Sequence, residues 1–180
     1  MPFGILNLVT GAVMILFGTS YETGDFWADC LEYWWAHTKD KCGRVRRLVI
    51  RLDNGPICAS NRKLFLKRMV AFARNTGLEI HLVYYPPYHS KYNPIERVWG
   101  ILEKHWNGTL LTSLGVAMKW AKTMTWQGQH PVDVVHLDKE YTKGIEVPKE
   151  EMEQVNAHIQ RSKTLPKWDV TITPHLAKCG

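Results

Sequence analysis

The chain has 180 residues, enough for one domain with a well-formed core but too few for two full ones. Hydrophobic residues make up 45% and charged residues 22%, a balance that excludes wholesale disorder. The formal net charge of +6 and the pI of about 9.2 favour a polyanionic partner, although many soluble proteins are mildly basic.

The N-terminal segment 3–18 contains no charged residue. It lacks the basic region with which a signal peptide begins, and it is short for a transmembrane helix. Thr10 and Gly11 divide it into two aliphatic runs, which predicts a hairpin of two buried strands, with membrane insertion as the minor alternative.

The cysteines form no C-x-x-C pair and have no histidine at zinc-finger spacing. This pattern predicts neither a disulfide framework nor a zinc site, and it fits a reducing compartment. We therefore expect a cytoplasmic protein with no membrane partner, in which the thiols are structural. These thiols belong to Cys30, Cys42, Cys58 and Cys179.

Strand-like and helix-like patterns alternate along the rest of the chain. The helical pattern 61–76 ends at Gly77, a typical helix C-cap, and Asn93-Pro94 is typical of an N-cap followed by the first helical residue. Such alternation indicates an α/β layer fold with at least one parallel strand pair. The predicted strands are 2–9, 12–19, 47–52, 79–85 and 168–173, and the predicted helices are 26–38, 61–76, 94–106, 112–126 and 148–162.

Two acidic residues are candidates for chemistry, and one of them lies at a strand end, where α/β sheets place their functional groups. Asp53 follows the aliphatic strand 47–52, and Glu96 lies in the first turn of a later helix. One helix and one strand separate them, so the second strand can run beside the first and the returning helix can bring Glu96 toward Asp53. Two-metal phosphoryl chemistry needs such convergent carboxylates, because hard oxygen ligands hold the two Mg²⁺ ions roughly 4 Å apart.

Both positions also have structural interpretations. Asp53-Asn54-Gly55 taken alone is a turn, in which the Asp side chain bonds its own backbone. Asn93-x-x-Glu96 taken alone is a capping box, in which Glu96 would satisfy the helix N-terminus.

A longer motif favours the functional interpretation. Residues 85–99 read Y-P-P-Y-H-S-K-Y-N-P-I-E-R-V-W. They resemble the signature of DDE transposases from mariner-related insertion sequences, in which P-P-x-x-S-x-x-N-P-I-E ends in the third catalytic carboxylate. The upstream L-D-N-G-P strand end matches the second carboxylate. Similar segments at 2–5, 26–35, 105–113 and 168–174 look most like the ISAzo-type transposases, so the resemblance covers nearly the whole chain.

This resemblance implies a ribonuclease-H-like α/β core, a mixed sheet flanked by helices, which is shared with retroviral integrases. It implies hydrolysis at transposon ends, followed by attack of the freed 3′-hydroxyl on target DNA. The partners would be DNA, as transposon ends and target, and another transposase chain. Asp53 and Glu96 would be catalytic and would ligate Mg²⁺ or Mn²⁺, with two ions expected only in the full-length enzyme.

Candidate DNA-binding residues lie in two places. One group surrounds Glu96, and the other lies on the outer face of the helix 61–76, where a basic face is also a common way to keep a helix solvated. The candidates are Lys91, Tyr92, Asn93 and Arg97 in the first group, and Arg62, Lys63 and Lys67 in the second.

In the family, the first catalytic Asp lies on a core strand ahead of the P-F-G-I segment, which here begins at Pro2. We therefore expect an N-terminally truncated transposase: residues 1–111 as a partial ribonuclease-H-like core that lacks its first, central strand, and residues 112–180 as a mixed α/β C-terminal extension of the same domain. Loss of that strand would leave two edges with unpaired backbone groups, at about 1–3 kcal/mol per group, unless the remaining strands pair directly. Glu22 and Asp25 are poor substitutes, because they follow the second hairpin strand at the far side of the sheet.

The chain is thus predicted to be a transposase fragment that is poorly stable and inactive alone. The main alternative is a non-catalytic DNA-binding or regulatory remnant of a transposase. A different ribonuclease-H-like nuclease, such as an integrase or a junction resolvase, fits the Asn-Pro-Ile-Glu-Arg context less well.

Overall fold

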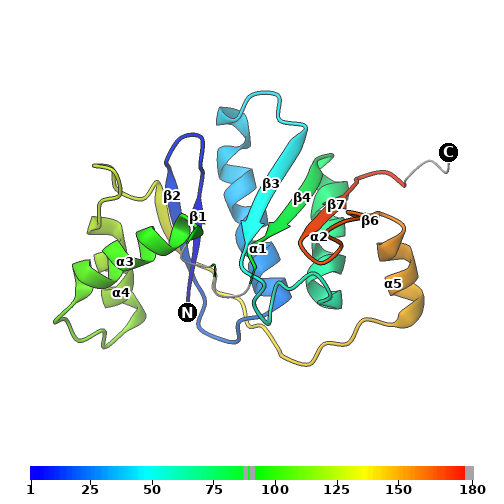
Figure 1. Cartoon of the computed structure of the whole chain (residues 1–180). Coiled ribbons are helices and arrows are strands. Elements are labelled where there is room, and N and C mark those ends of the chain that lie inside the picture. The colour runs from blue at the N-terminus through cyan, green and yellow to red at the C-terminus, as the bar shows by residue number, and fades with distance from the viewer. Residues whose placement is uncertain (87–88, 90–91, 177–180) are drawn as a thin grey trace.

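The computed structural model describes residues 1–86, 89 and 92–176. Within them the chain alternates strands and helices, as its sequence pattern predicts (Figure 1). The elements are β1 (Pro2–Leu6), β2 (Val13–Phe17), α1 (Gly24–Thr38), the 3₁₀ turn η1 (Lys39–Lys41), β3 (Arg47–Leu52), α2 (Lys63–Thr76), β4 (Glu79–Tyr84), α3 (Ile95–Trp106), α4 (Leu114–Thr123), β5 (Asp133–His136), α5 (Lys149–Asn156), β6 (Ile159–Arg161) and β7 (Asp169–Ile172).

The uncharged N-terminal segment forms the predicted hairpin. β1 pairs antiparallel with β2, and Gly11 in the connection has φ 74°, a left-handed conformation that glycine adopts without strain. Every residue of β2 is buried, because β5 runs parallel to β2 on its other edge and helices cover the sheet. In the described part of the chain, no helix is long and apolar enough to cross a membrane.

The second sheet has the strand order β3-β4-β7-β6. β3 and β4 are parallel and in register from Arg47 opposite Glu79 to Leu52 opposite Tyr84, which confirms the expected parallel pair. β7 and β6 then add antiparallel, so this sheet is mixed. One face packs on helices, and the residues of β3 alternate accordingly: Leu48 and Ile50 point inward, while Val49 is 50% exposed.

The expected single sheet is instead two separate sheets. β1 pairs only with β2, and β3 pairs only with β4, so the hairpin and the Asp53 strand are not hydrogen-bonded to one another within the described residues. The sequence analysis left open that the strands on either side of the missing one pair directly. These strands are β1 and β3, and within the described residues they do not pair. The two sheets still belong to one hydrophobic interior, because Ile5 of β1 and Leu48 of β3 each contact the same two clusters of buried side chains.

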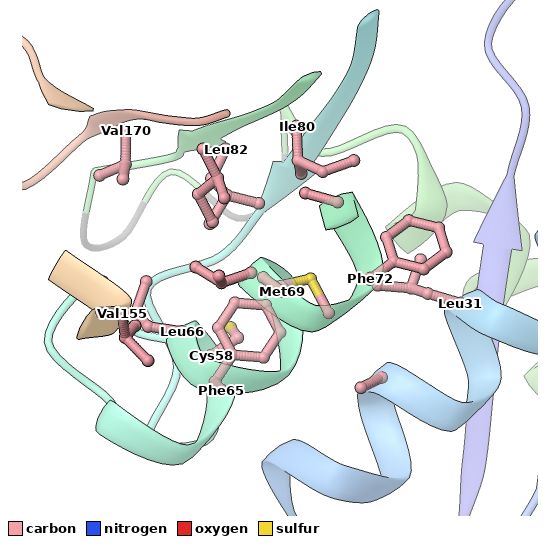
Figure 2. Close-up of a cluster of buried hydrophobic side chains, with 14 of the residues drawn as sticks. Leu31, Cys58, Phe65, Leu66, Met69, Phe72, Ile80, Leu82, Val155 and Val170 are labelled. Atoms are coloured by element: carbon pink, nitrogen blue, oxygen red, sulfur yellow. The ribbon is translucent and has the colours of Figure 1, made fainter. Parts of the chain in front are cut away.

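Helices cover both sheets. α1 lies between them and packs on α2, while α3 and α4 cover the β1-β2-β5 sheet (Figure 1). Figure 2 shows the main cluster, in which α2 directs Phe65, Leu66 and Met69 toward Ile80 and Leu82 of the second sheet. Burying a large aliphatic or aromatic side chain stabilises the fold by roughly 1.5–3 kcal/mol, so this cluster is a principal source of stability.

Several predicted boundaries were wrong. The predicted helix 148–162 ends at Asn156, and the chain continues into β6, because residues 159–161 find a partner in β7 that local periodicity does not reveal. β5 was missed for the same reason. Pro94, not Asn93, stands at the N-cap of α3, and no side chain caps this helix, so the capping-box interpretation of Glu96 is also wrong.

Candidate metal and nucleic-acid site

The parallel pair β3/β4 brings two functional segments to one edge of the second sheet. Leu52 and Tyr84 are paired at the carboxyl ends of these strands, and the Tyr85 amide donates to the Leu52 carbonyl at 2.8 Å. Asp53 therefore leaves the sheet at the same edge as the segment that leads to α3. Open α/β sheets place their functional groups at such carboxyl ends.

The turn after β3 is held by hydrogen bonds to buried atoms. The Cys58 thiol donates to the Asp53 carbonyl at 3.1 Å, and the Ala59 amide donates to the Gly55 carbonyl at 3.0 Å. From β4, the Tyr84 hydroxyl donates to the Cys58 carbonyl at 2.9 Å. The backbone on both sides of Asp53 is therefore tied to the core, although the Asp53 side chain itself is exposed.

Close packing of α3 on β1 positions Glu96. A Cβ atom at Gly4 would lie 2.5 Å from Cζ2 of Trp99 and 3.2 Å from Cδ1 of Ile95, so only glycine admits the helix at this distance. Buried Val98 and Leu102 then continue the contact into the cluster under β2. Glu96 lies in the first turn of this helix, on the side exposed to solvent.

The carboxylates of Asp53 and Glu96 lie near enough to interact. The pKa of Glu96 is raised, first because neighbouring protein atoms remove part of its hydration, and second because of the negative charge of Asp53. Two like charges held in this way repel each other when both are ionised. A bound cation would relieve that repulsion.

The donor chemistry of this pair fits a divalent cation such as Mg²⁺. Magnesium in proteins is held by one or two carboxylates and completes its shell with water and substrate phosphates. Asp53 and Glu96 supply two such carboxylates. Among the described residues, however, no group of three or more His, Cys, Asp or Glu side chains could hold a metal ion.

The first group of candidate DNA-binding residues is divided. Tyr92 is 61% exposed and stacks with His89 at a ring-centroid distance of 5.7 Å, and Arg97 is exposed on α3. Asn93 is 9% exposed, and its carbonyl accepts from the Glu96 amide at 3.0 Å. Lys91 lies outside the described residues.

The basic face of α2 is partly neutralised. Arg62 and Lys63 at its start are exposed, whereas the Lys67 ammonium forms an ion pair with Glu151 of α5 at 2.8 Å. Arg68 is a further basic residue of α2, but its guanidinium is turned toward α1, and its side chain is only 20% exposed.

Arg68 ties α2 to α1 through three carboxylates. Its guanidinium contacts Asp25 at 2.8 Å, Asp29 at 2.5 Å and Glu32 at 3.2 Å. Burial alone would raise the pKa of Asp29, but hydrogen bonds from Lys139, Arg68 and Tyr141 outweigh burial and hold that pKa below its ordinary value. Asp25, considered as a substitute catalytic acid, is therefore engaged in packing two helices together.

Sequence reasoning missed the roles of Gly4, Cys58 and Arg68. Each role depends on a contact with a distant part of the chain or on a turn whose geometry the residue types do not specify. The only available signal was the position of Cys58 inside the turn that follows Asp53, and a single cysteine there is also typical of ordinary core packing.

Comparison with known proteins agrees with the resemblance drawn from the motifs. The family model described as the Rhodopirellula transposase DDE domain matches residues 1–174. Searches of curated proteins and of solved structures found no match. Because the family model spans nearly the whole chain, the protein belongs to the DDE transposase domain family.

Proposed function

We propose that this chain is the catalytic-core portion of an insertion-sequence transposase, and that Asp53 and Glu96 are two of its catalytic metal ligands. The observation that carries the proposal is the parallel pair β3/β4, which brings Asp53 to the same sheet edge as the segment leading to α3, where Glu96 lies in the first turn. The negative charge of Asp53, as a contributor to the raised pKa of Glu96, supports it. The reaction class is metal-dependent cleavage of DNA strands and strand transfer.

Asp53 and Glu96 would hold Mg²⁺ or Mn²⁺ through carboxylate oxygens. The ion, when bound, would stabilise the charge that develops on oxygen during phosphoryl transfer. The protein supplies the geometry: β3 and its turn hold Asp53, and the Gly4–Trp99 contact sets the position of the helix that carries Glu96. Exposed Arg97 and Tyr92 flank Glu96 and are suited to contact phosphate and a base or sugar.

We further propose a ribonuclease-H-like architecture in which a central strand is lacking between β1 and β3. In support, β1 and β3 each end a sheet, and Ile5 and Leu48 contact the same clusters. The remaining carboxylate of the DDE set would come from that strand, so the chain is expected to be inactive alone.

Hydrogen exchange tests this architecture. Peptides covering β1 and β3 should lose protection faster than those covering β2 and β4, because each of the first two has a partner on one edge only. Equal protection of all four strands would contradict the proposed gap.

Two measurements test the function. The purified chain should bind Mn²⁺, and Asp53→Asn and Glu96→Gln should each weaken binding, with the double variant little weaker than either single one. The chain should not nick supercoiled plasmid DNA in Mg²⁺ or Mn²⁺. If neither substitution changes the affinity for Mn²⁺, the proposed metal site is wrong. If the purified chain cleaves DNA efficiently, the proposal that it lacks a catalytic carboxylate is wrong.

A non-catalytic DNA-binding remnant is the second candidate. It is favoured by the lack of a three-ligand group among the described residues. Under this alternative, DNA affinity survives Asp53→Asn and is lost with the basic residues. Arg62→Ala should reduce the slope of log affinity against log salt by about 1, whereas Lys67→Ala should change it less because Lys67 is already paired with Glu151.

A further inference from the structure

The thiol of Cys58 is the closest described hydrogen-bonding partner of the Asp53 side chain. Its Sγ lies 3.1 Å from the Asp53 carbonyl oxygen and 3.6 Å from the carboxylate Oδ1, and donates toward both. No hydrogen bond to the other carboxylate oxygen, Oδ2, occurs within the described part of the chain. The thiol therefore contacts one carboxylate oxygen and leaves the second one available.

The core fixes the position of this thiol. Cys58 is 0% exposed and belongs to the same buried cluster as Phe65 and Leu66. Its carbonyl accepts from Tyr84 of β4, so the backbone that carries the sulfur is tied to the strand beside β3. A donor held in this way can orient a flexible neighbour at little entropic cost, because its own freedom is already lost.

A thiol carries one proton, and two oxygens of Asp53, the carbonyl oxygen and Oδ1, lie within reach of that proton.

We propose that Cys58 is a positioning residue: its S–H holds the main chain and Oδ1 of Asp53, so that Oδ2 is presented to the cation. This inference rests on the proposed role of Asp53 as a metal ligand. It assigns to Cys58 more than the structural packing that a buried thiol ordinarily provides. Partners of this kind, which orient a ligand without touching the metal, typically change metal affinity by 10–100-fold when they are removed.

The test compares three variants of the full chain by Mn²⁺ titration. Cys58→Ala removes the donor and should weaken Mn²⁺ binding about tenfold. Cys58→Ser restores a donor at nearly the same place and should recover binding to within about threefold of the wild type. Cys30→Ala is the matched control, since Cys30 is also 0% exposed but packs in a different cluster, away from Asp53.

Cys30→Ala should lower the melting temperature without changing the Mn²⁺ affinity. The proposal is overturned if Cys58→Ala binds Mn²⁺ like the wild type, or if Cys58→Ser loses as much affinity as Cys58→Ala. The first result would mean that the thiol does not orient Asp53. The second would mean that the shape of the cysteine side chain affects Mn²⁺ affinity, whereas its donated hydrogen bond does not.

A second readout separates this proposal from the proposed function. If the wild-type chain fails to bind Mn²⁺, the proposed metal site is wrong. Hydrogen exchange of the Ala59 amide, which donates to the Gly55 carbonyl, still reports on the stability of the turn after β3. That exchange should be faster in Cys58→Ala and close to wild type in Cys58→Ser and Cys30→Ala. Identical exchange in Cys58→Ala and the wild type overturns the role of the thiol whatever the metal does.

Discussion

Replacing Gly4 by alanine tests the contact that positions Glu96. The added Cβ would lie 2.5 Å and 2.7 Å from two ring atoms of Trp99. Carbon atoms pack at about 3.5–4.0 Å, so the ring, and α3 with it, must move by roughly 1 Å. Overpacking of this kind typically costs about 1–3 kcal/mol, and the intrinsic gain from replacing glycine in a strand, roughly 0.5–1 kcal/mol, offsets only part of that cost.

Thermal unfolding followed by circular dichroism measures the effect. For a chain of this size each kcal/mol shifts Tm by about 2–4 °C, so Gly4→Ala should melt several degrees below the wild type. Gly100→Ala in α3 is the control, because no atom lies within 4 Å of its added Cβ. Alanine in a helix interior is favoured over glycine by about 0.8–1.0 kcal/mol, so this variant should melt higher.

The opposite result for Gly4→Ala would refute the packing argument. If that variant is as stable as the wild type, α3 does not lie against β1 at the distance described, and the placement of Glu96 near Asp53 loses its basis. A loss of stability in Gly100→Ala equal to that in Gly4→Ala would point to a general intolerance of alanine and would not support a specific contact with Trp99.

Two further predictions concern charge. Asp53→Asn should lower the pKa of Glu96 toward its ordinary value but leave it raised, because partial desolvation, the larger cause, remains. A ¹³C NMR titration of the Glu96 carboxyl measures this pKa. An unchanged pKa would mean that the two side chains do not interact. Arg68→Met should lower the free energy of unfolding by about 2–3 kcal/mol at pH 7, because it leaves partly buried carboxylates without their cationic partner. This figure is below the usual range for a fully buried ion pair, because the carboxylates are partly exposed to solvent. Asp29 has a lowered folded pKa, so its contribution is present above its unfolded pKa of about 3.9 and is lost as pH falls through the folded value. The difference in free energy of unfolding between the wild type and Arg68→Met, measured in urea, should therefore become smaller below about pH 4. A difference that does not change with pH would contradict the role of Asp29.

Local patterns predicted most elements because each depends on neighbouring residues. The strand 47–52 was predicted with the boundaries that the structure has, since its aliphatic run ends at a strong turn signal. The helix that follows was placed to within two residues by its periodicity and by Gly77, which has φ 73° at the C-cap. The end of α5 was missed because residues 159–161 become a strand only when β7 lies beside them.

The candidate site rests partly on such local patterns. A long motif and the order strand, helix, strand, helix predict that Asp53 and Glu96 are site residues, and the parallel pair β3/β4 brings the segments that carry them to one edge of the sheet. The partners of the basic residues were not predictable. Whether Lys67 meets DNA or Glu151, and whether Arg68 faces solvent or three carboxylates, depends on how α5 and α1 pack against α2.

The sequence by itself determined the family, the order of most elements and the two acids at the ends of their segments, because these are encoded in short-range patterns and one extended motif. Only the tertiary structure decided that the strands form two sheets, that a glycine on β1 allows α3 to pack closely against that strand, and that a buried thiol contacts Asp53. These features depend on the distances between side chains after packing. Residue types alone do not specify such distances, since the same side chains could satisfy their hydrogen bonds and bury their surface in more than one arrangement.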